Sequence, residues 1–260
     1  MAFATAKEND SDLLIVSEPN KNTTKGLEWM KDKNHDVSVL LLNRKIEIQK
    51  VKAYESFISI KTKGLTVICC YISPNIPIGV YKEKVNEIME VGRRTRKRCI
   101  ILGDIYAKSV LWGSPVSDPR GDYWAEWLAA LDMVVMNTGL EPTFTRGESR
   151  SFIDVTCCTQ DVALGVGEWR VLTKESLSDH QFIQFFVEGI GVVDKYTWTK
   201  VEYDWKCFKT LLKWTLELAP EDILNGTSGC QATIKEILKA SLKQSTGEKT
   251  KNPYWWNDEI

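Results

Sequence analysis

Four carboxylates and one histidine of this chain stand beside apolar runs, and they are the residues best placed to do chemistry. Glu18 follows LLIVS, Asp104 follows CIILG, Asp154 lies within SFIDVT, and Asp179 and His180 lie within LSDHQFI. The run CIIL at 99–102 has no polar alternation, which is typical of a strand buried on both faces of a sheet. We therefore expect these side chains at the rim of a sheet, where strands end and water is partly excluded.

Carboxylates and a histidine at such a rim suit the hydrolysis of a phosphodiester. That reaction needs hard oxygen ligands for Mg²⁺ or Mn²⁺, a carboxylate that aligns water, and a donor facing the phosphate. A further carboxylate commonly fixes the tautomer of the histidine. Taken alone, Asp104 and Glu18 also fit solvated turns, and His180 also fits a structural role. Asp154 is harder to explain that way, because a charge buried in a strand without a partner is costly.

The composition narrows the class of protein. The 260 residues are 43% hydrophobic and carry a net charge of −1, which allows one sizeable core and gives no overall basic character. A nucleic-acid ligand would therefore have to meet a local basic patch. No apolar run approaches the ~20 residues of a membrane span, and the first ten residues lack a secretory pattern. Seven cysteines without a CxxC pair and two histidines indicate reduced thiols, no structural zinc, and a nuclear or cytoplasmic protein.

Periodicity and turn signals predict mixed elements up to about residue 190. Helices are expected at 3–10, 80–91 and 122–131, and strands at 12–17, 36–42, 46–51, 57–60, 65–72, 99–102, 133–136, 152–158, 169–172 and 181–187. Hairpins alternate with helix-linked strands, which favours an α/β protein. We expect a four-layer α/β sandwich of two mixed sheets flanked by helices.

The remaining residues, 191–260, have no strand pattern and too little apolar content for a core of their own. Amphipathic helices are predicted at 203–218 and 232–243, followed by the aromatic segment NPYWWNDEI. This part is expected to be a helical tail that connects to something beyond residue 260.

The motifs of the chain, taken in order, carry a resemblance to a known family. They are SEP (17–19), YISPN (71–75), LGDIYAKSVLWGS (102–114), EPTFTR (141–146), SFIDVT (151–156) and SDH (178–180). This series resembles the endonuclease/exonuclease/phosphatase superfamily and, more narrowly, the apurinic-like endonuclease domain of arthropod non-LTR (LINE-type) retrotransposons. The resemblance implies an endonuclease-like domain at 1–190 that lacks the family's first strand. It also implies that 191–260 leads toward a reverse transcriptase domain.

The same resemblance implies roles for the acidic residues and the histidine. Glu18 would bind the divalent metal, Mg²⁺ or Mn²⁺, with Asp179 beside it. Asp104 would align and activate the water. His180 would contact the scissile phosphate, with its ring held by Asp154. The implied reaction is hydrolysis of one strand of double-stranded DNA, which leaves a 3'-hydroxyl that primes reverse transcription.

Four further residues are expected at the substrate. Tyr71 and Thr143 would line the phosphate site, and Ser178 would support the SDH turn. Tyr106 stands where the family pattern G-D-x-N has asparagine. A phenol cannot copy both hydrogen bonds of the amide, so we expect weakened activity at this substrate-binding position.

Two other readings of the sequence stay open. One is a different member of the superfamily, such as a repair apurinic endonuclease or a phosphatase for inositol lipids or sphingomyelin. The other is a remnant that binds nucleic acid without cutting it. The basic run RRTRKR at 93–98 suits DNA or an anionic lipid, and it equally suits a solvated helix end.

Overall fold

The computed structural model describes residues 1–20, 22, 24, 28–95, 98–188, 205–218 and 237. The chain divides into two compact units, Met1–Val193 and Asp194–Ile260. In the second unit the predicted helix at 203–218 is observed as α5 (Trp205–Leu218). The predicted helix at 232–243, apart from residue 237, and the segment NPYWWNDEI lie outside the described residues.

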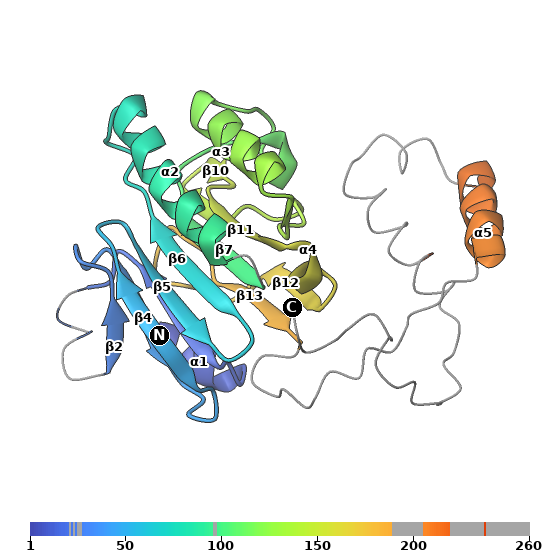
Figure 1. Ribbon diagram of the computed structural model, residues 1–260. Helices are drawn as coiled ribbons and strands as arrows, with labels where there is room; N and C mark the ends of the chain where they lie inside the picture. Colours follow the sequence, from blue (N-terminus) through green and yellow to red (C-terminus); the bar gives the residue numbers. More distant parts are fainter. Residues whose placement is uncertain are drawn as a thin grey trace, which may run out of the picture. The chain divides into compact units, whose positions relative to one another are not determined.

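A mixed six-stranded sheet forms the centre of the first unit (Figure 1). Its order is β4 (Ile48–Ala53), β5 (Phe57–Thr62), β6 (Thr66–Tyr71), β7 (Cys99–Asp104), β11 (Asp154–Thr159) and β8 (Met133–Val135). The β6–β7 pair is parallel and the other pairs are antiparallel. β6 is buried along its whole length. In β7, for which the apolar run CIIL predicts burial on both faces, Cys99–Ile101 are buried and Leu102 is partly buried. The α/β class with mixed strand pairing is thereby confirmed.

Two helices, α2 (Ile78–Thr95) and α3 (Pro119–Ala130), lie side by side over one face of this sheet (Figure 1). Their apolar faces and the sheet enclose a core that includes Phe57, Ile68, Val85, Ile101 and Trp124. Both helices are longer than the periodicity predicts. α3 begins at Pro119, because the Asp118 side chain accepts a hydrogen bond from the Gly121 N–H and caps the first turn.

The opposite face of the sheet packs against antiparallel strands. They are β1 (Leu13–Ser17), β3 (Val37–Leu41) and β2 (Trp29–Lys31), in the order β1-β3-β2, and the pair β12 (Val166–Val171) and β13 (Ile183–Val187). The second core contains Val39 of β3, Ile60 of β5, Ile100 of β7 and Val166 of β12. The arrangement of apolar cores on both faces agrees with a sandwich, and the expectation of four layers stays a prediction.

Several short elements were not predicted from the sequence. They are β2, the hairpin of β9 (Phe144–Arg146) and β10 (Ser149–Ser151), the 3₁₀ turn η1 (Val110–Trp112) and α4 (Gln160–Ala163); α1 (Ala2–Glu8) matches the expected first helix. Elements of three or four residues are too short to show a period. In the part of the chain that the structure describes, no helix has the length and apolar character needed to cross a bilayer.

Gly103 allows β7 to run against β6 just before Asp104. Its φ is +148°, and a Cβ at this position would lie 1.8 Å from the carbonyl oxygen of Cys70, its partner in the parallel ladder. Only glycine fits both the backbone conformation and this close approach. Gly103 therefore sets the direction in which the chain enters Asp104.

We expect Gly103→Ala to lower the free energy of unfolding by about 3–5 kcal/mol, because strained backbone and overpacking add together. Urea unfolding measures the loss. Gly147→Ala is the matched control, since Gly147 also has a positive φ (+57°) but no atom within 4 Å of the place that a methyl group would take. We expect the control to lose about 1–2 kcal/mol. Equal losses in the two variants would contradict the role given to the contact with Cys70.

Candidate active site

Three neighbouring strands bring Tyr71, Asp104 and Asp154 to one edge of the large sheet. Tyr71 ends β6 and is paired with Asp104, which ends β7 in the same direction. Asp154 begins β11 and lies directly opposite Asp104 in the antiparallel ladder. The register therefore places two carboxylates face to face, although 49 intervening residues separate them in the sequence. The expectation that acids gather at a strand end is met here.

His180 completes this group from the loop between β12 and β13. Its Nδ1 lies 3.1 and 3.0 Å from the two carboxylate oxygens of Asp154, and its Nε2 lies 3.6 Å from Oδ2 of Asp104. The imidazole also packs edge-on against Phe144, with ring centroids 5.0 Å apart. Single donor atoms of Asp104, Asp154 and His180 lie within 4.8 Å of one another, so they form a possible metal-binding group among the described residues.

Burial and neighbouring charges shift the pKa values of Asp104 and His180 away from their usual values. Burial raises the pKa of the Asp104 carboxyl to about 7, and the charge of Asp154 adds to the rise, while His180 and the Tyr106 N–H oppose it. Burial by itself lowers the pKa of His180. The hydrogen bond and charge of Asp154, helped by Asp104 and Glu18, outweigh burial and raise that pKa to about 9. The surroundings therefore favour the protonated imidazole, and they make the Asp104 carboxyl bind its proton more tightly than an exposed aspartate does.

Glu18 lies near Tyr71. Burial raises the pKa of the Tyr71 phenol far above its usual value, and the nearby Glu18 and Asp104 carboxylates add to the rise. Glu18 is exposed at the end of β1, has a φ of +47°, and donates its backbone N–H to the Asp36 carbonyl at 2.7 Å. The phenol therefore stays protonated near Glu18, at the rim that carries Asp104.

The oxygen donors at this rim fit a divalent cation. Glu18 and Asp104 offer carboxylate oxygens, which Mg²⁺ and Mn²⁺ prefer, whereas the protonated Tyr71 phenol is a poor ligand. A nearby cation would also favour the charged form of Asp104, which burial disfavours. Asp154 is the less suitable ligand, because both of its carboxylate oxygens already face the His180 ring.

Asp179 is not part of the tight group. Its Oδ2 lies 3.5 Å from Nε of Arg146 in β9, and its side chain is 47% exposed. Its backbone carbonyl accepts the N–H of Thr145 at 2.8 Å. In this arrangement Asp179 fastens the loop of His180 to the β9–β10 hairpin, and its expected place beside a metal stays a prediction.

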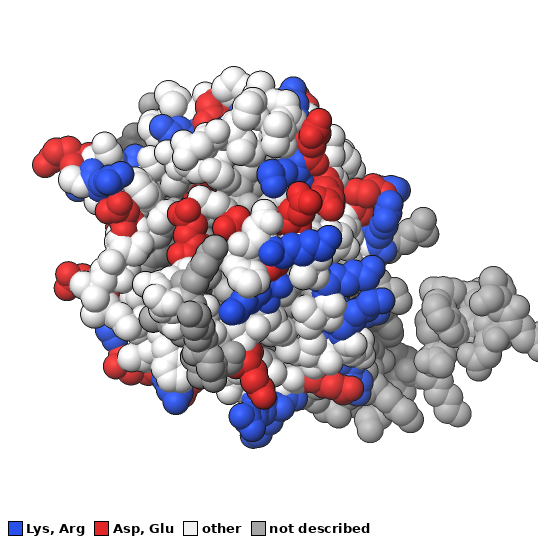
Figure 2. Space-filling model, turned by 90° about the vertical axis from the view of Figure 1, so that its left-hand side faces the viewer, with Lys and Arg blue, Asp and Glu red and all other residues white. Residues whose placement is uncertain are grey.

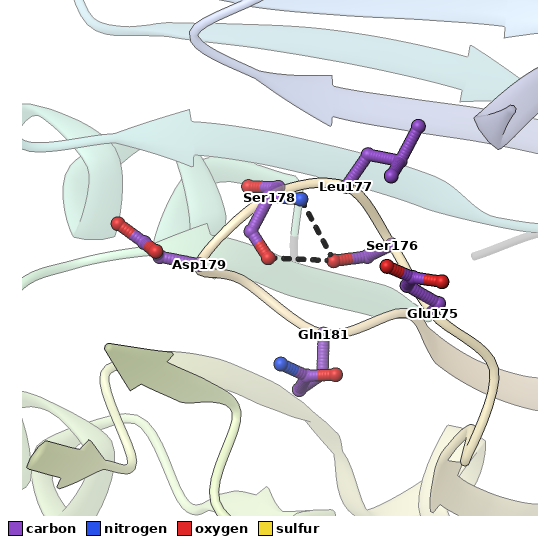
Figure 3. A pocket seen from close by; sticks show the side chains of 6 residues that line it. All are labelled: Glu175, Ser176, Leu177, Ser178, Asp179 and Gln181. Carbon is purple, nitrogen blue, oxygen red and sulfur yellow. Dashed lines mark hydrogen bonds between the residues drawn. The ribbon is translucent and has the colours of Figure 1, made fainter. Parts of the chain in front are cut away.

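Two serines shape the loop that carries His180 (Figure 3). The Ser178 hydroxyl accepts the His180 N–H at 3.2 Å, which is the contact needed to support the SDH turn. Ser176 accepts the Ser178 N–H at 3.1 Å, and its hydroxyl lies within donating distance of the Ser178 and His180 carbonyls. Ser176 was missed in the sequence, where only its place in a polar loop indicates a turn. The loop borders an open depression of about 570 Å³.

Thr143 lies behind the site rather than at its surface. It is fully buried, and its hydroxyl accepts the N–H groups of Ile153 and Asp154 at 3.2 and 3.1 Å. Its carbonyl accepts the Gln181 N–H at 2.8 Å. The expectation that Thr143 lines an open phosphate site is therefore corrected: its hydroxyl is occupied by backbone donors, and it holds the strand of Asp154 to the His180 loop.

Asn137 is a second supporting residue that sequence reasoning missed. Its amide nitrogen donates to the Asp154 carbonyl at 2.9 Å, and its amide oxygen accepts the Thr156 N–H at 2.8 Å. These bonds continue the pairing of β8 with β11 beyond the end of β8. The only signal in the sequence is an Asn–Thr–Gly turn after a predicted strand.

Tyr106 occupies a backbone conformation that asparagine and glycine adopt more readily. Its φ is +45°, its side chain is 41% exposed, and its N–H donates to Oδ1 of Asp104 at 3.1 Å. The left-handed conformation costs a non-glycine residue roughly 1–2 kcal/mol, and asparagine tolerates it better. Position 106 therefore has a backbone conformation that asparagine tolerates well, although its side chain is a phenol.

We expect Tyr106→Asn to raise the free energy of unfolding by about 1 kcal/mol, because asparagine relieves the left-handed strain. Urea unfolding provides the measurement. Tyr106→Phe is the control: it keeps an aromatic ring and the same strain, so its stability should equal that of the parent. A phenylalanine variant that gains as much as the asparagine variant would show that strain is not the cause.

We expect the imidazole of His180 to titrate with a midpoint near 9. Asp154→Asn should lower that midpoint by about 1–3 pH units, since the opposite charge that favours the protonated ring is removed. Proton NMR of the imidazole signals measures both values. The other histidine, His35, serves as an internal control whose signal should not move with the substitution. An unchanged His180 midpoint would contradict the assigned pairing.

Comparisons with known proteins agree with this geometry. Residues 65–184 match the family model described as endonuclease-reverse transcriptase, a range that contains Tyr71, Asp104, Asp154 and His180. The endonuclease domain of TRAS1, a telomere-specific non-LTR retrotransposon, is 25% identical with a TM-score of 0.62. That match covers 73% of this chain and 90% of the TRAS1 domain. No curated protein sequence matches the chain significantly.

Two more distant structures share the fold. An AP endonuclease from Archaeoglobus fulgidus is 14% identical, with a TM-score of 0.59, over 73% of this chain and 93% of that protein. A 3'-5' exonuclease from Neisseria meningitidis is 18% identical, with a TM-score of 0.55, over 71% of this chain and 92% of that protein. The chain therefore has the endonuclease/exonuclease/phosphatase fold.

Proposed function

We propose that this chain is a metal-dependent DNA endonuclease of a non-LTR retrotransposon. It would hydrolyse one phosphodiester of double-stranded target DNA and leave a 3'-hydroxyl that primes reverse transcription. The observation that carries the proposal is the placement of His180 between Asp154 and Asp104 at the end of β7. The match of residues 65–184 and the likeness to the TRAS1 endonuclease domain support the retrotransposon context.

His180 is suited to meet the scissile phosphate. Its pKa near 9 keeps the ring protonated at neutral pH, so that it can donate a hydrogen bond to a phosphate oxygen. The two contacts from Asp154 to Nδ1 leave Nε2 as the nitrogen that faces Asp104 and the substrate side. Asp154 thus positions the ring and preserves its charge.

Asp104 is suited to align the attacking water and accept its proton. Burial raises the pKa of this carboxyl, which makes the carboxylate a stronger base than that of an exposed aspartate. The Tyr106 N–H holds Oδ1, so the carboxylate keeps one orientation. The protonated Tyr71 phenol beside it can donate to a phosphate oxygen.

A Mg²⁺ or Mn²⁺ ion held by Glu18 would supply Lewis-acid stabilisation of charge on the phosphate. Asp179 is the further carboxylate proposed beside it. Figure 2 shows one face of the molecule on which acidic side chains gather near the middle and Lys and Arg side chains lie beside them. Such a local combination suits a cation and a polyanionic strand, even though the net charge of the chain is −1.

Within the retrotransposon the partners would be double-stranded DNA and a reverse transcriptase domain. We propose that residues 1–190 form the endonuclease domain and that 191–260 connect it toward the reverse transcriptase. The likeness to an AP endonuclease keeps a repair enzyme of the same superfamily as the second candidate. A preference for duplexes with an abasic site over intact duplexes distinguishes that candidate.

We expect the chain to nick supercoiled plasmid with Mg²⁺ or Mn²⁺ and not with EDTA. A polymerase should extend the nick directly, without prior phosphatase treatment, because the product ends in a 3'-hydroxyl. His180→Ala should slow nicking by about 10²-fold or more, since the positioned donor to the phosphate is lost. Agarose gels that resolve supercoiled from open-circular plasmid give the rates.

Arg170→Ala is the matched control, because Arg170 is an exposed residue of β12 that pairs with Glu168 of the same strand. It should nick at the parent rate. A folded parent chain that leaves plasmid supercoiled with either metal, yet retards DNA on gels in EDTA, would support the non-catalytic remnant. Nicking in that case by Tyr106→Asn alone would identify the phenol as the defect.

A further inference from the structure

We infer that Arg120, near the start of α3, is a positioning residue: it holds the loop leading away from Tyr71 against the turn of α3 that also holds the loop after Asp104. Its guanidinium donates to three backbone carbonyls of one loop: Nη1 to Ser73 at 3.4 Å, and Nη2 to Pro74 at 3.0 Å and Ile76 at 2.6 Å. All three acceptors lie more than 40 residues away in the sequence. One side chain therefore binds three carbonyl groups of a loop that has no regular secondary structure.

The loop whose carbonyls accept hydrogen bonds from Arg120 begins directly after Tyr71. Residues 72–77 connect the last residue of β6, Tyr71, to α2. Within it, Ser73 lies close enough to the Tyr71 hydroxyl to influence the pKa of the phenol. Because Arg120 fixes the carbonyl of Ser73, it holds this neighbour of the phenol in place.

Tyr81 of α2 provides the surface on which Arg120 rests. The guanidinium lies 4.8 Å from the centre of the Tyr81 ring, and that ring is fully buried. Stacking on an aromatic face fixes the plane of a guanidinium and leaves its N–H groups free to donate at its edge. A lysine could supply charge at this place but not three donors in one plane.

The same turn of α3 also holds the loop after Asp104. The Asp118 N–H donates to the Lys108 carbonyl at 2.9 Å, and a Cβ on Gly121 would lie 1.8 Å from that oxygen. Residues 118–121 therefore touch 105–109 closely while Arg120 reaches 73–76. The two loops are joined a second time where the Ile72 N–H donates to the Asp104 carbonyl at 2.9 Å.

Arg120 thus acts on the proposed cation site without touching it. The carboxyl ends of β6 and β7 carry Tyr71 and Asp104, and Glu18 lies near the Tyr71 phenol. A fixed distance between the two strand ends sets the spacing of the oxygen donors. This inference rests on the proposed function for its activity readout, and on cation binding for a readout that does not need DNA.

The test compares Arg120→Met and Arg120→Lys with the control Arg170→Met. Mn²⁺ binding to the full chain without DNA is measured by electron paramagnetic resonance, and the Mg²⁺ dependence of plasmid nicking is measured in parallel. We expect Arg120→Met to need about tenfold more Mn²⁺ for half-saturation, the size of effect typical of residues that orient metal ligands. Arg120→Lys should fall between Arg120→Met and the parent, and Arg170→Met, at an exposed arginine of β12, should match the parent.

Maximal nicking at saturating Mg²⁺ should stay within about twofold of the parent rate in Arg120→Lys, because the reacting groups are intact. Parent-like Mn²⁺ binding by a folded Arg120→Met or Arg120→Lys overturns the inference, as does a parent chain that binds no Mn²⁺. If Arg120→Met does not fold, the Mn²⁺ affinity of Arg120→Lys is the deciding measurement. Mn²⁺ binding that depends on Arg120 in a chain that never nicks DNA supports the positioning role and counts against the proposed function alone.

Discussion

The buried carboxylate of Asp104 is the constraint on which the site depends. A charge placed at the end of a central strand is unfavourable unless positive groups face it, and the surroundings of Asp104 follow from that requirement. His180 approaches it with a protonated ring, Asp154 keeps that ring charged, and the Tyr106 N–H holds one oxygen. The balance leaves Asp104 with a pKa near 7. The group is therefore costly to assemble for stability and well suited to proton transfer.

The rest of the fold keeps these opposing groups in place. Gly103 lets β7 pass close to Cys70 of β6, and the strand register then sets Asp104 beside Tyr71 and opposite Asp154. Thr143 and Asn137 secure the start of β11 through backbone hydrogen bonds. Most of these supports are main-chain contacts, which tolerate little displacement. Asp104 and Asp154 thus lie on strands, whereas His180 lies on a loop that several hydrogen bonds hold in place.

The β9–β10 hairpin borders the loop that carries His180, because Phe144 of β9 forms a β-bridge with His180. In this chain Arg146 of the hairpin is tied to Asp179, so the hairpin and the His180 loop are linked by charge. A displacement of the hairpin would therefore also displace the loop that carries His180.

The sequence by itself determined the strand that ends in Asp104, most of the regular elements, and the residue types at the site. Apolar runs and turn residues are local signals, so Cys99–Asp104 and the α2 and α3 helices could be predicted without any knowledge of packing. The pairing of Asp154 with His180 was implied by the family resemblance, but only the tertiary structure decided several other contacts. The position of Thr143 behind the site, the Arg146–Asp179 contact and the contacts of Arg120 join residues far apart in the chain. Such contacts leave no periodic trace in a sequence, because they arise from register and loop closure rather than from local conformational preference.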